Sequence, residues 1–471
     1  MPLVLSTGEH FDAIIIGCGM SGIAAGIRLA MYDKRILIVE QHNAPGGLNG
    51  FYFKDGRKFD VGLHAVTNYV APGTKRAPLT KLLRQLRIDR DALDLCPQIS
   101  SRIVFPDCSL GFSNEFGYFE NQVAEVFPKQ MDGFRKLVEY VRHFDALNYN
   151  GPVLSARTVL KEYISDPLLI NMLMCPMCYY GSARDDNDMD FDQFVVMFES
   201  VLVEGFCRPF EGVRRIIKVL LDRYREVGGK RKMRAQVKQL LTDGKRVSGV
   251  ELVDGTVFTA DQVLSSAGLC ETLKLLPEPK SLAPVGTMSF VETIQVLPKE
   301  PKEYGIEDTI VFFSRQNDFH YASPTEPVDL QSGVICMPNN YDFGERSMEE
   351  GMIRLTAQAH AGFWNELNGH AYEERKDYWF HQMQDTLAYV YPHVDLAQLK
   401  RDELMYDMFT PKTVERFTHH LNGAVYGSPK KIKTGETDYE NLFLMGTDQG
   451  FLGIIGSLLS GISMVNRHCL L

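Results

Sequence analysis

The sequence has no excess of positive charge and no disulfide framework. Its 471 residues include 50 lysines and arginines against 60 aspartates and glutamates, a formal net charge of −10 at pH 7. A field of that sign repels a phosphate backbone, which argues against nucleic acid as a partner. Nine cysteines are too few for a disulfide scaffold in a chain of this length, and their odd number leaves at least one thiol unpaired. We therefore expect a reducing compartment.

Long hydrophobic runs are also missing. The opening segment MPLVLSTGEHFDAIIIG has no basic region and no apolar stretch long enough for a signal peptide, so we expect a cytoplasmic protein. Residues 450–466 are uncharged over a length near the lower limit of about 17 residues for a membrane span, but their glycines favour a core helix. The basic residues 230–232 and Arg234 are typical of a solvated turn, although they would also suit peripheral contact with anionic lipid.

The sequence does contain an α/β pattern, in separated pieces. Strand-like apolar runs and helical periods alternate at residues 11–40, return between 212 and 267, and end with a strand at 441–446 and a helix at 450–466. Residues 74–200 show helical patterns without repeated strands, and strand candidates at 289–297, 309–314 and 333–337 precede helices expected over 349–367 and 374–391. We predict an α/β fold in which a Rossmann-like domain (residues 1–73, 205–283 and 405–471) carries an inserted α+β domain (residues 74–204 and 284–404).

The strongest motif is GCGMSG at residues 17–22, which fits GxGxxG and lies between a strand and a helix. Gly17 would allow the tight turn, Gly19 the approach of backbone amides to a pyrophosphate, and Gly22 close packing of helix on strand. The start of the helix supplies partial positive charge. Glu40 ends the second strand, where a carboxylate accepts hydrogen bonds from ribose hydroxyls. Together these features predict a dinucleotide site.

A second glycine pair favours a flavin dinucleotide over a nicotinamide one. Gly46 and Gly47 follow Glu40 closely, and FDVGLH follows at residues 59–64. A flavin dinucleotide extended across the domain needs further places of close backbone approach. Near the C-terminus, Asp448 is a candidate acceptor for ribityl hydroxyls, and the amides of residues 453–455 are candidates to face the pyrimidine edge of the flavin.

These motifs resemble a known family. GCGMSGIAAG, IVEQHNAPGGLNG, FDVGLH, the stretch at residues 211–268, TPKTVERF, GAVYG and GTDQGFLGIIGSLLSG look like the flavin oxidoreductases related to phytoene desaturase, carotenoid isomerase and retinol saturase. The sequence departs from that family where Leu48 replaces the usual arginine or threonine after the glycine pair, so no polar side-chain contact is expected there. The resemblance implies cofactor-binding roles for Gly17, Gly19, Ser21, Gly22, Glu40, Gly46, Gly47, Leu48, His64, Val237, Asp448, Gly453 and Ile455.

The resemblance also implies a function. It predicts non-covalent FAD and hydride transfer between flavin N5 and an apolar unsaturated substrate, which is an isoprenoid, a polyene or an acyl chain. Desaturation, saturation and isomerisation remain open, as does the electron donor or acceptor. Two alternatives remain. The first is an amine oxidase, which would need an aromatic cage at the flavin; the sequence offers only modest support for such a cage, because its only tryptophans are Trp364 and Trp379. The second is a flavin-binding protein without catalysis, which would carry the same motifs.

Weaker features have more ordinary interpretations. Cys175 and Cys178 form a CxxC, but no second pair completes a zinc site and the run is Met-rich, which favours buried packing. His64, His419 and His420 are candidates to approach the flavin, although a structural role is the simpler reading of each. A set of aromatic and Met side chains would suit a long apolar tunnel or an ordinary core: Tyr179, Tyr180, Phe191, Phe194, Met197 and Phe198.

Overall fold

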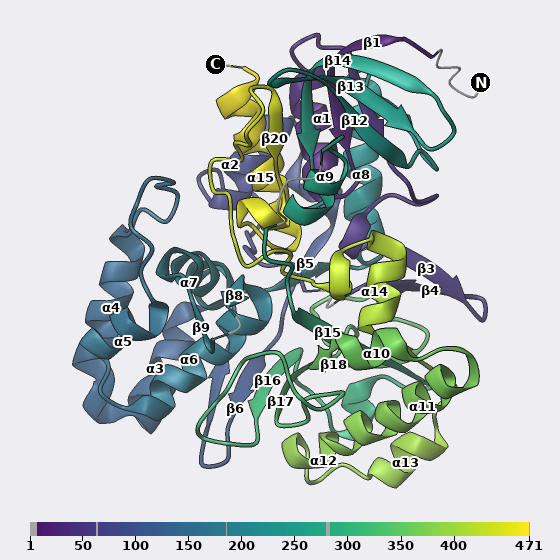
Figure 1. Cartoon of the computed structure of the whole chain (residues 1–471). Coiled ribbons are helices and arrows are strands. Elements are labelled where there is room, and N and C mark those ends of the chain that lie inside the picture. Colours follow the sequence, from purple (N-terminus) through teal and green to yellow (C-terminus); the bar gives the residue numbers. More distant parts are fainter. Residues whose placement is uncertain (1–6, 63–64, 185, 279–282, 471) are drawn as a thin grey trace.

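A computed structural model describes residues 7–62, 65–184, 186–278 and 283–470 of the chain (Figure 1). Its first sheet has seven strands in the order β11-β2-β1-β14-β13-β12, with β20 on β14. The strands are β1 (His10–Ile16), β2 (Ile36–Val39), β11 (Lys230–Lys232), β12 (Val237–Asp243), β13 (Arg246–Leu252), β14 (Val257–Ser265) and β20 (Leu442–Leu444). β1 pairs in parallel with β2 and β14, whereas β13 runs antiparallel to β12 and β14.

Strands from distant parts of the chain meet in this sheet, as the α/β pattern predicts. The apolar runs of β1 and β2 are almost wholly buried, because helices cover them. Helix α1 (Met20–Ala30) packs between α8 (Val213–Glu226) and α15 (Gly453–His468), and α2 (Pro78–Leu86) adds to this layer. Helix α9 (Leu269–Lys274) packs through Leu273 against the cluster on the other face of the sheet. Gly255, with a φ of +81°, makes the turn between β13 and β14. The domain boundaries given above remain a prediction.

The second sheet also has seven strands, in the order β19-β15-β18-β17-β16-β6-β7. They are β6 (Ser101–Val104), β7 (Ser109–Phe112), β15 (Met288–Leu297), β16 (Ile310–Ser314), β17 (Ser332–Cys336), β18 (Gly351–His360) and β19 (Met405–Phe409). Helices α10 (Ala361–Glu366), α11 (Gly369–Asp385), α12 (Leu387–Val390) and α13 (Leu396–Arg401) share one hydrophobic cluster with strands of this sheet and lie to its right or below it in Figure 1. Smaller strands are β3 (Phe51–Lys54), β4 (Arg57–Asp60), β5 (Leu95–Pro97), β8 (Ala183–Arg184), β9 (Asp188–Met189) and β10 (Cys207–Pro209).

Two sequence predictions about this sheet were wrong. The helix expected over residues 349–367 is instead the ten-residue strand β18 followed by the short α10. β18 lies between β15 and β17 and is buried on both faces. Apolar and polar residues alternate along it from Ile353 to His360, which is a strand pattern, but its Met, Arg, Leu, Ala and Gln residues also favour a helix and concealed that pattern. Residues 74–200 contain β5, β6 and β7, which are only three or four residues long and therefore carry little periodicity.

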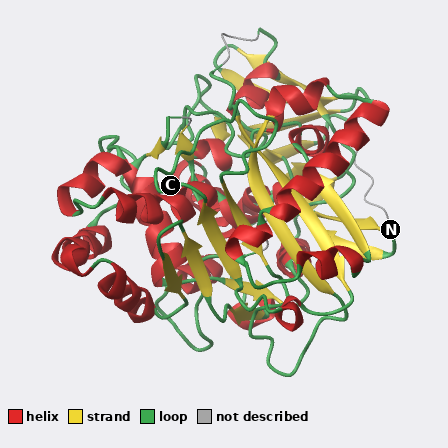
Figure 2. Ribbon diagram, turned by 90° about the horizontal axis from the view of Figure 1, so that it is seen from below, coloured by secondary structure: helices red, strands yellow, loops and turns green. Residues whose placement is uncertain are grey.

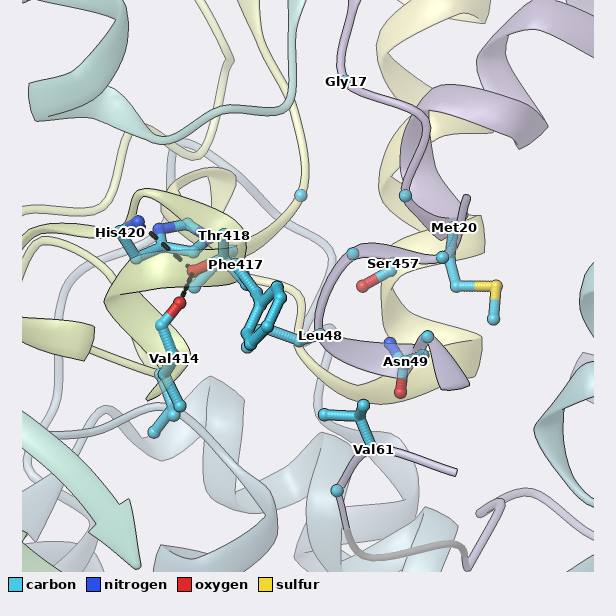
Figure 3. A pocket seen from close by; sticks show the side chains of 18 of the residues that line it. Gly17, Met20, Leu48, Asn49, Val61, Val414, Phe417, Thr418, His420 and Ser457 are labelled. Atoms are coloured by element: carbon cyan, nitrogen blue, oxygen red, sulfur yellow. Dashed lines mark hydrogen bonds between the residues drawn. The ribbon is translucent and has the colours of Figure 1, made fainter. Parts of the chain in front are cut away.

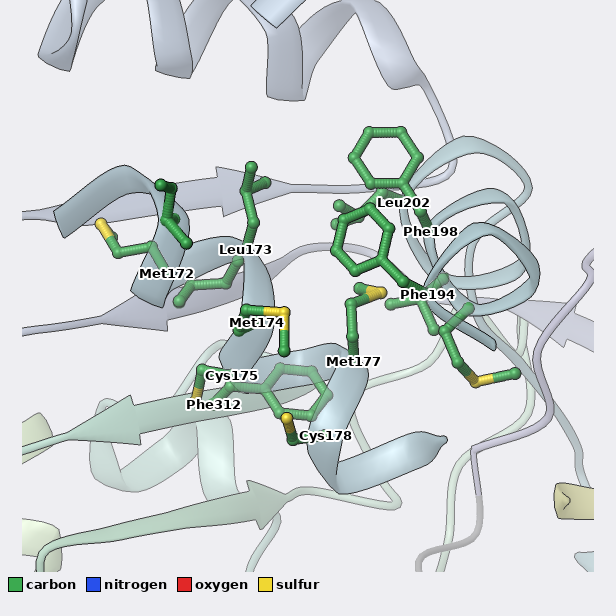
Figure 4. Close-up of a cluster of buried hydrophobic side chains, with 14 of the residues drawn as sticks. Met172, Leu173, Met174, Cys175, Met177, Cys178, Phe194, Phe198, Leu202 and Phe312 are labelled. Carbon is green, nitrogen blue, oxygen red and sulfur yellow. The ribbon is translucent and has the colours of Figure 1, made fainter. Parts of the chain in front are cut away.

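A group of helices flanks the second sheet, at the left of Figures 1 and 2. It comprises α3 (Phe116–Val126), α4 (Met131–His143), α5 (Ala156–Tyr163), α6 (Pro167–Tyr180) and α7 (Phe191–Met197). Figure 4 shows Cys175 and Cys178 of α6 among Met, Leu and Phe side chains of the core. Both thiols are fully buried, and burial raises the pKa of Cys178 to about 12. The CxxC therefore serves packing.

Within the described part of the chain, no helix has both the length and the apolar character that a membrane crossing requires. The uncharged run near the C-terminus forms α15, whose apolar side chains pack against α1. The basic residues expected in a solvated turn instead form the edge strand β11, and Nζ of Lys230 lies 2.9 Å from Oε1 of Glu9. Peripheral contact with anionic lipid through this cluster stays a prediction.

Candidate active site

A cavity of about 790 Å³ is lined by residues of both sheets and of the helices between them (Figure 3). One end is formed by the turn before α1, the ends of β2 and β12 and the segment after β14. The other end is formed by α6, β15 and β18 and is rich in aromatic side chains. The volume falls in the range of about 300–1,000 Å³ that is usual for ligand sites.

The first glycine motif forms the turn that leads from β1 into α1. Gly17 has a φ of +101°, which favours glycine, and a Cβ there would lie 2.3 Å from Oγ of Ser266. A Cβ on Gly22 would lie 2.1 Å from the carbonyl oxygen of Gly17, so this glycine allows the helix to pack on the strand. Gly19 lines the cavity and has no atom within 4 Å of its Cβ position. A larger residue at position 19 would put its side chain into this open space.

Glu40 is held in place by the backbone. Its Oε2 accepts a hydrogen bond from the N–H of Cys18 at 2.7 Å, and its Oε1 accepts one from the N–H of His42 at 2.8 Å. Glu40 also lines the cavity, beside Val237 of β12. Because each carboxylate oxygen has a second lone pair, both can still accept a hydrogen bond from a ligand hydroxyl.

The second glycine pair lies directly against the first motif. The N–H of Gly46 donates to the carbonyl of Cys18 at 2.9 Å, and the φ of Gly46 is +120°. Gly47 and Leu48 continue the cavity wall in a short 3₁₀ turn. Leu48 faces Phe417 in Figure 3, so its contact is apolar. This agrees with the absence of an arginine or threonine at this position.

Two helices begin at the cavity without a side-chain cap. The N-cap of α1 is Gly19 and the N-cap of α15 is Leu452, and the first turn of neither helix contains an acidic residue. Gly453 has a φ of +68° and no atom within 4 Å of its Cβ position. Open space at both helix starts lets anionic or carbonyl oxygen atoms approach unpaired backbone N–H groups. Together with the fixed Glu40, this arrangement fits a dinucleotide such as FAD.

Not every residue predicted for the site lies there. Gly17, Gly19, Ser21, Glu40, Gly46, Gly47, Leu48, Val237 and Gly453 line the cavity. Gly22 packs behind the turn, against the carbonyl of Gly17. Ile455 packs in the core and does not line the cavity, although the preceding Ile454 does. His64 lies outside the described residues.

The prediction that Asp448 accepts from ribityl hydroxyls is not supported. Asp448 is 1% exposed and does not line the cavity. Its two carboxylate oxygens accept hydrogen bonds from the N–H groups of Leu269 at 2.5 Å and Ser428 at 2.8 Å, and Nζ of Lys431 lies 3.5 Å away. This carboxylate therefore ties α9, the 428–431 segment and the start of α15 together.

One helix that lines the cavity had no role predicted from the sequence. Helix α14 (Pro411–Thr418) begins with Thr410, whose side chain forms a capping box with Thr413. Val414 and Phe417 line the cavity, and α14 contacts the turn that holds Leu48 (Figure 3). The Thr-Pro pair predicts a helix start, but nothing local indicates which surface the helix covers.

The aromatic end of the cavity contains four rings, from Tyr179, Tyr180, Phe290 and Tyr426. The rings of Tyr179 and Phe290 stack with centroids 5.9 Å apart, and Tyr426 meets Phe290 edge-on at 5.7 Å. Met197 also lines this end, whereas Phe191, Phe194 and Phe198 stack on one another in the core. Of the six side chains for which a tunnel and a core were both open, three line this cavity and three pack in the core. Neither tryptophan lines the cavity.

Two histidines lie on the opposite wall. His419 and His420 line the cavity just after α14. His420 is buried, and its Nδ1 lies 3.9 Å from Oε1 of Glu271, which also accepts a hydrogen bond from the N–H of Leu421. His420 therefore has a structural partner in Glu271 and also lines the cavity, so its position fits both of the roles considered for it.

Comparisons with known proteins agree with this geometry. The prolycopene isomerase 2 of an Oncidium hybrid cultivar is 24% identical over 505 aligned residues, which cover 98% of this chain and 84% of that protein. The all-trans-retinol 13,14-reductase of Rattus norvegicus is 24% identical, with 96% and 84% covered. A crystal structure of an oxidoreductase from Methanosarcina mazei has the same fold, with a TM-score of 0.67, 15% identity and coverage of 97% and 100%. The model of the family described as flavin containing amine oxidoreductase matches residues 20–298, more than half of the chain. The chain therefore belongs to this family and is an FAD-dependent oxidoreductase.

Proposed function

We propose that this enzyme catalyses hydride transfer between flavin N5 and a carbon atom of an apolar, unsaturated substrate such as a polyene, another isoprenoid or an acyl chain. The observation that carries the proposal is the continuity of one cavity from a glycine-lined dinucleotide end to an aromatic end. The relatives that match almost the whole chain are named for prolycopene and retinol, which supports a polyene.

The backbone around the first two glycine motifs would hold the cofactor. Gly19 and Ser21 would offer N–H groups to the diphosphate, whereas Gly17, whose N–H already donates to the carbonyl of Val39, shapes the turn. Gly46 and Gly47 would allow the diphosphate to lie close to the chain. Glu40 would accept hydrogen bonds from the adenosine ribose, beside Val237. The unpaired amides at Gly453 and Ile454 would stabilise negative charge at the edge of the ring. Bound FAD supplies a hydride acceptor or donor at N5 of its isoalloxazine ring.

The other end of the cavity would orient a flat, conjugated chain. The rings of Tyr179, Phe290 and Tyr426 offer wide apolar faces whose contacts with a planar polyene are favourable. Apolar contact is worth about 25 cal/mol per Å² of surface removed from water, so a long hydrocarbon chain gains affinity from its length without any charged anchor. Val414 and Phe417 of α14 line the wall that faces Leu48, where they would shield a bound ring system from water.

Two measurements test this proposal. The purified protein should show the visible spectrum of an oxidised flavin, and a colourless protein that FAD does not reconstitute would refute it. Anaerobic mixing of the oxidised enzyme with saturated and partly unsaturated isoprenoids, acyl compounds and amines should then bleach the flavin band only with the apolar compounds. The reduced enzyme should be reoxidised by polyenes if the reaction runs toward saturation. Bleaching by amines alone would instead identify an amine oxidase.

A further inference from the structure

A group of polar atoms lies at the aromatic end of the cavity, where an apolar substrate needs none. Strands β15 and β18 place Glu292 and Thr356 directly opposite each other in the antiparallel register, and both residues are buried and line the cavity. Tyr180 of α6 lines the same end. The hydroxyl groups of Thr356 and Tyr180 are inaccessible to solvent and have no hydrogen-bond partner among the described residues.

The charges in this group already balance. Oε1 of Glu292 lies 2.6 Å from Nε of Arg354, and the two side chains are 7% and 1% exposed. Nη1 of Arg354 donates to the carbonyl of Asp60 at 3.1 Å, whereas its Nη2 is buried and has no partner among the described residues. Burial raises the pKa of Glu292, and the nearby guanidinium of Arg354 opposes that rise.

Unpaired buried polar atoms indicate what the site binds. Each such atom costs about 1–3 kcal/mol, and folded proteins therefore pair nearly all of them. A hydrocarbon would leave the hydroxyl groups of Tyr180 and Thr356 unpaired, whereas an oxygen atom in the cavity would accept hydrogen bonds from them. A charged group would be buried without a counter-ion, because Glu292 and Arg354 neutralise each other.

We propose that the substrate carries a neutral oxygen-bearing group at the aromatic end of the cavity: either a hydroxyl, which donates to Glu292 and accepts from Tyr180 and Thr356, or a carbonyl, which accepts from Tyr180 and Thr356. This inference rests on the proposed function and narrows it from unsaturated hydrocarbons to their alcohols, aldehydes or ketones. Arg354 acts as a positioning residue, because it holds the carboxylate of Glu292 and is itself tied to the backbone of Asp60.

The test compares equilibrium binding of three probes to the oxidised holoenzyme without oxygen: a polyene alcohol, its aldehyde, and the hydrocarbon of the same chain length. The shift of the polyene absorption band gives Kd without turnover. We expect one or both oxygenated probes to bind about tenfold or more tightly than the hydrocarbon, the effect of one or two neutral hydrogen bonds. Tyr180→Phe and Thr356→Val should each reduce this preference severalfold.

Tyr179→Phe is a matched control. Tyr179 precedes Tyr180 and also lines the cavity, but its hydroxyl already has a partner in Oγ of Ser332 at 2.9 Å. Its removal should leave the preference for oxygenated probes unchanged. Thr356→Val gives a second reading of the same site if Tyr180→Phe fails to fold.

Three results would overturn the inference alone. The first is that the wild type binds all three probes with equal affinity. The second is that Tyr179→Phe and Tyr180→Phe change the preference for oxygenated probes equally. The third is that the Tyr180 and Thr356 variants lose FAD affinity while their preference for oxygenated probes stays unchanged. The last result would assign the unpaired atoms to the cofactor. Failure of the wild type to bind any polyene would refute the proposed function itself.

Discussion

Replacement of Glu40 by glutamine should separate the adenosine end of the site from the flavin end. Each oxygen of this carboxylate accepts one backbone hydrogen bond, from Cys18 at 2.7 Å and from His42 at 2.8 Å. An amide has a single acceptor oxygen, so its NH₂ group must face one of these N–H donors. A hydrogen bond to a charged group contributes about 1.5–3 kcal/mol, and the variant loses one of these as well as the charge that ribose hydroxyls would meet.

We therefore expect the Kd for FAD to rise about 10- to 100-fold in Glu40→Gln, since 1.4 kcal/mol corresponds to a factor of ten. The assay is titration of the apoprotein, followed by quenching of flavin fluorescence. FMN serves as the internal control because it lacks the adenosine half, so its Kd should change less than threefold. Glu40→Asp keeps the charge and should recover part of the affinity. An unchanged Kd for FAD, or an equal loss for FMN, would refute the role of Glu40.

Three further variants or measurements test the surroundings of the site. Asp448→Asn should lower the free energy of unfolding by about 3 kcal/mol in a denaturant titration, because it leaves Lys431 buried without its counter-ion. A flavin titration should show little change in FAD affinity. A selective loss of FAD affinity would instead restore a cofactor role for Asp448. Burial raises the pKa of Glu204 from 4.5 to about 7 in the folded protein. The folded state therefore binds this proton more tightly than the unfolded state does, and the free energy of unfolding should fall by about 3 kcal/mol as the pH rises from 4.5 through 7. Denaturant titrations of Glu204→Gln over the same pH range should not show this fall. Cys175 and Cys178, whose buried thiols have raised pKa values, should resist alkylation until the protein unfolds, as peptide mass mapping would show.

The dinucleotide end of the site could be predicted from the sequence because its requirements are local. The positive φ of Gly17 and the contact between Gly22 and the carbonyl of Gly17 arise within one turn, so glycines at fixed spacing reveal them. Glu40 is found by its place at the end of a strand. The core strands β15, β16 and β17 were also predicted, because each is rich in the β-branched, aromatic and other apolar residues that favour strands.

The remainder depends on contacts between distant segments. β18 is rich in helix-forming residues that mask its alternation of apolar and polar residues, and pairing with β15 and β17 on either side fixes it as a strand. Asp448 stands in a motif that suggests a cofactor ligand, but its partners Leu269 and Ser428 come from two other segments. No periodicity in the local sequence reports such partners.

The same limit explains why the polar group at the aromatic end escaped prediction. Glu292 and Thr356 are 64 positions apart, and they become neighbours through the register of β15 and β18, with Tyr180 added from a helix. In the sequence each stands among other polar residues of its own strand, such as Gln295 or Gln358, so nothing local distinguishes it. In the fold they meet beside a balanced ion pair and face a cavity. A site that only had to hold a hydrocarbon would be more stable with valine and phenylalanine at positions 356 and 180, so the retention of their hydroxyl groups argues for a substrate that hydrogen-bonds to them.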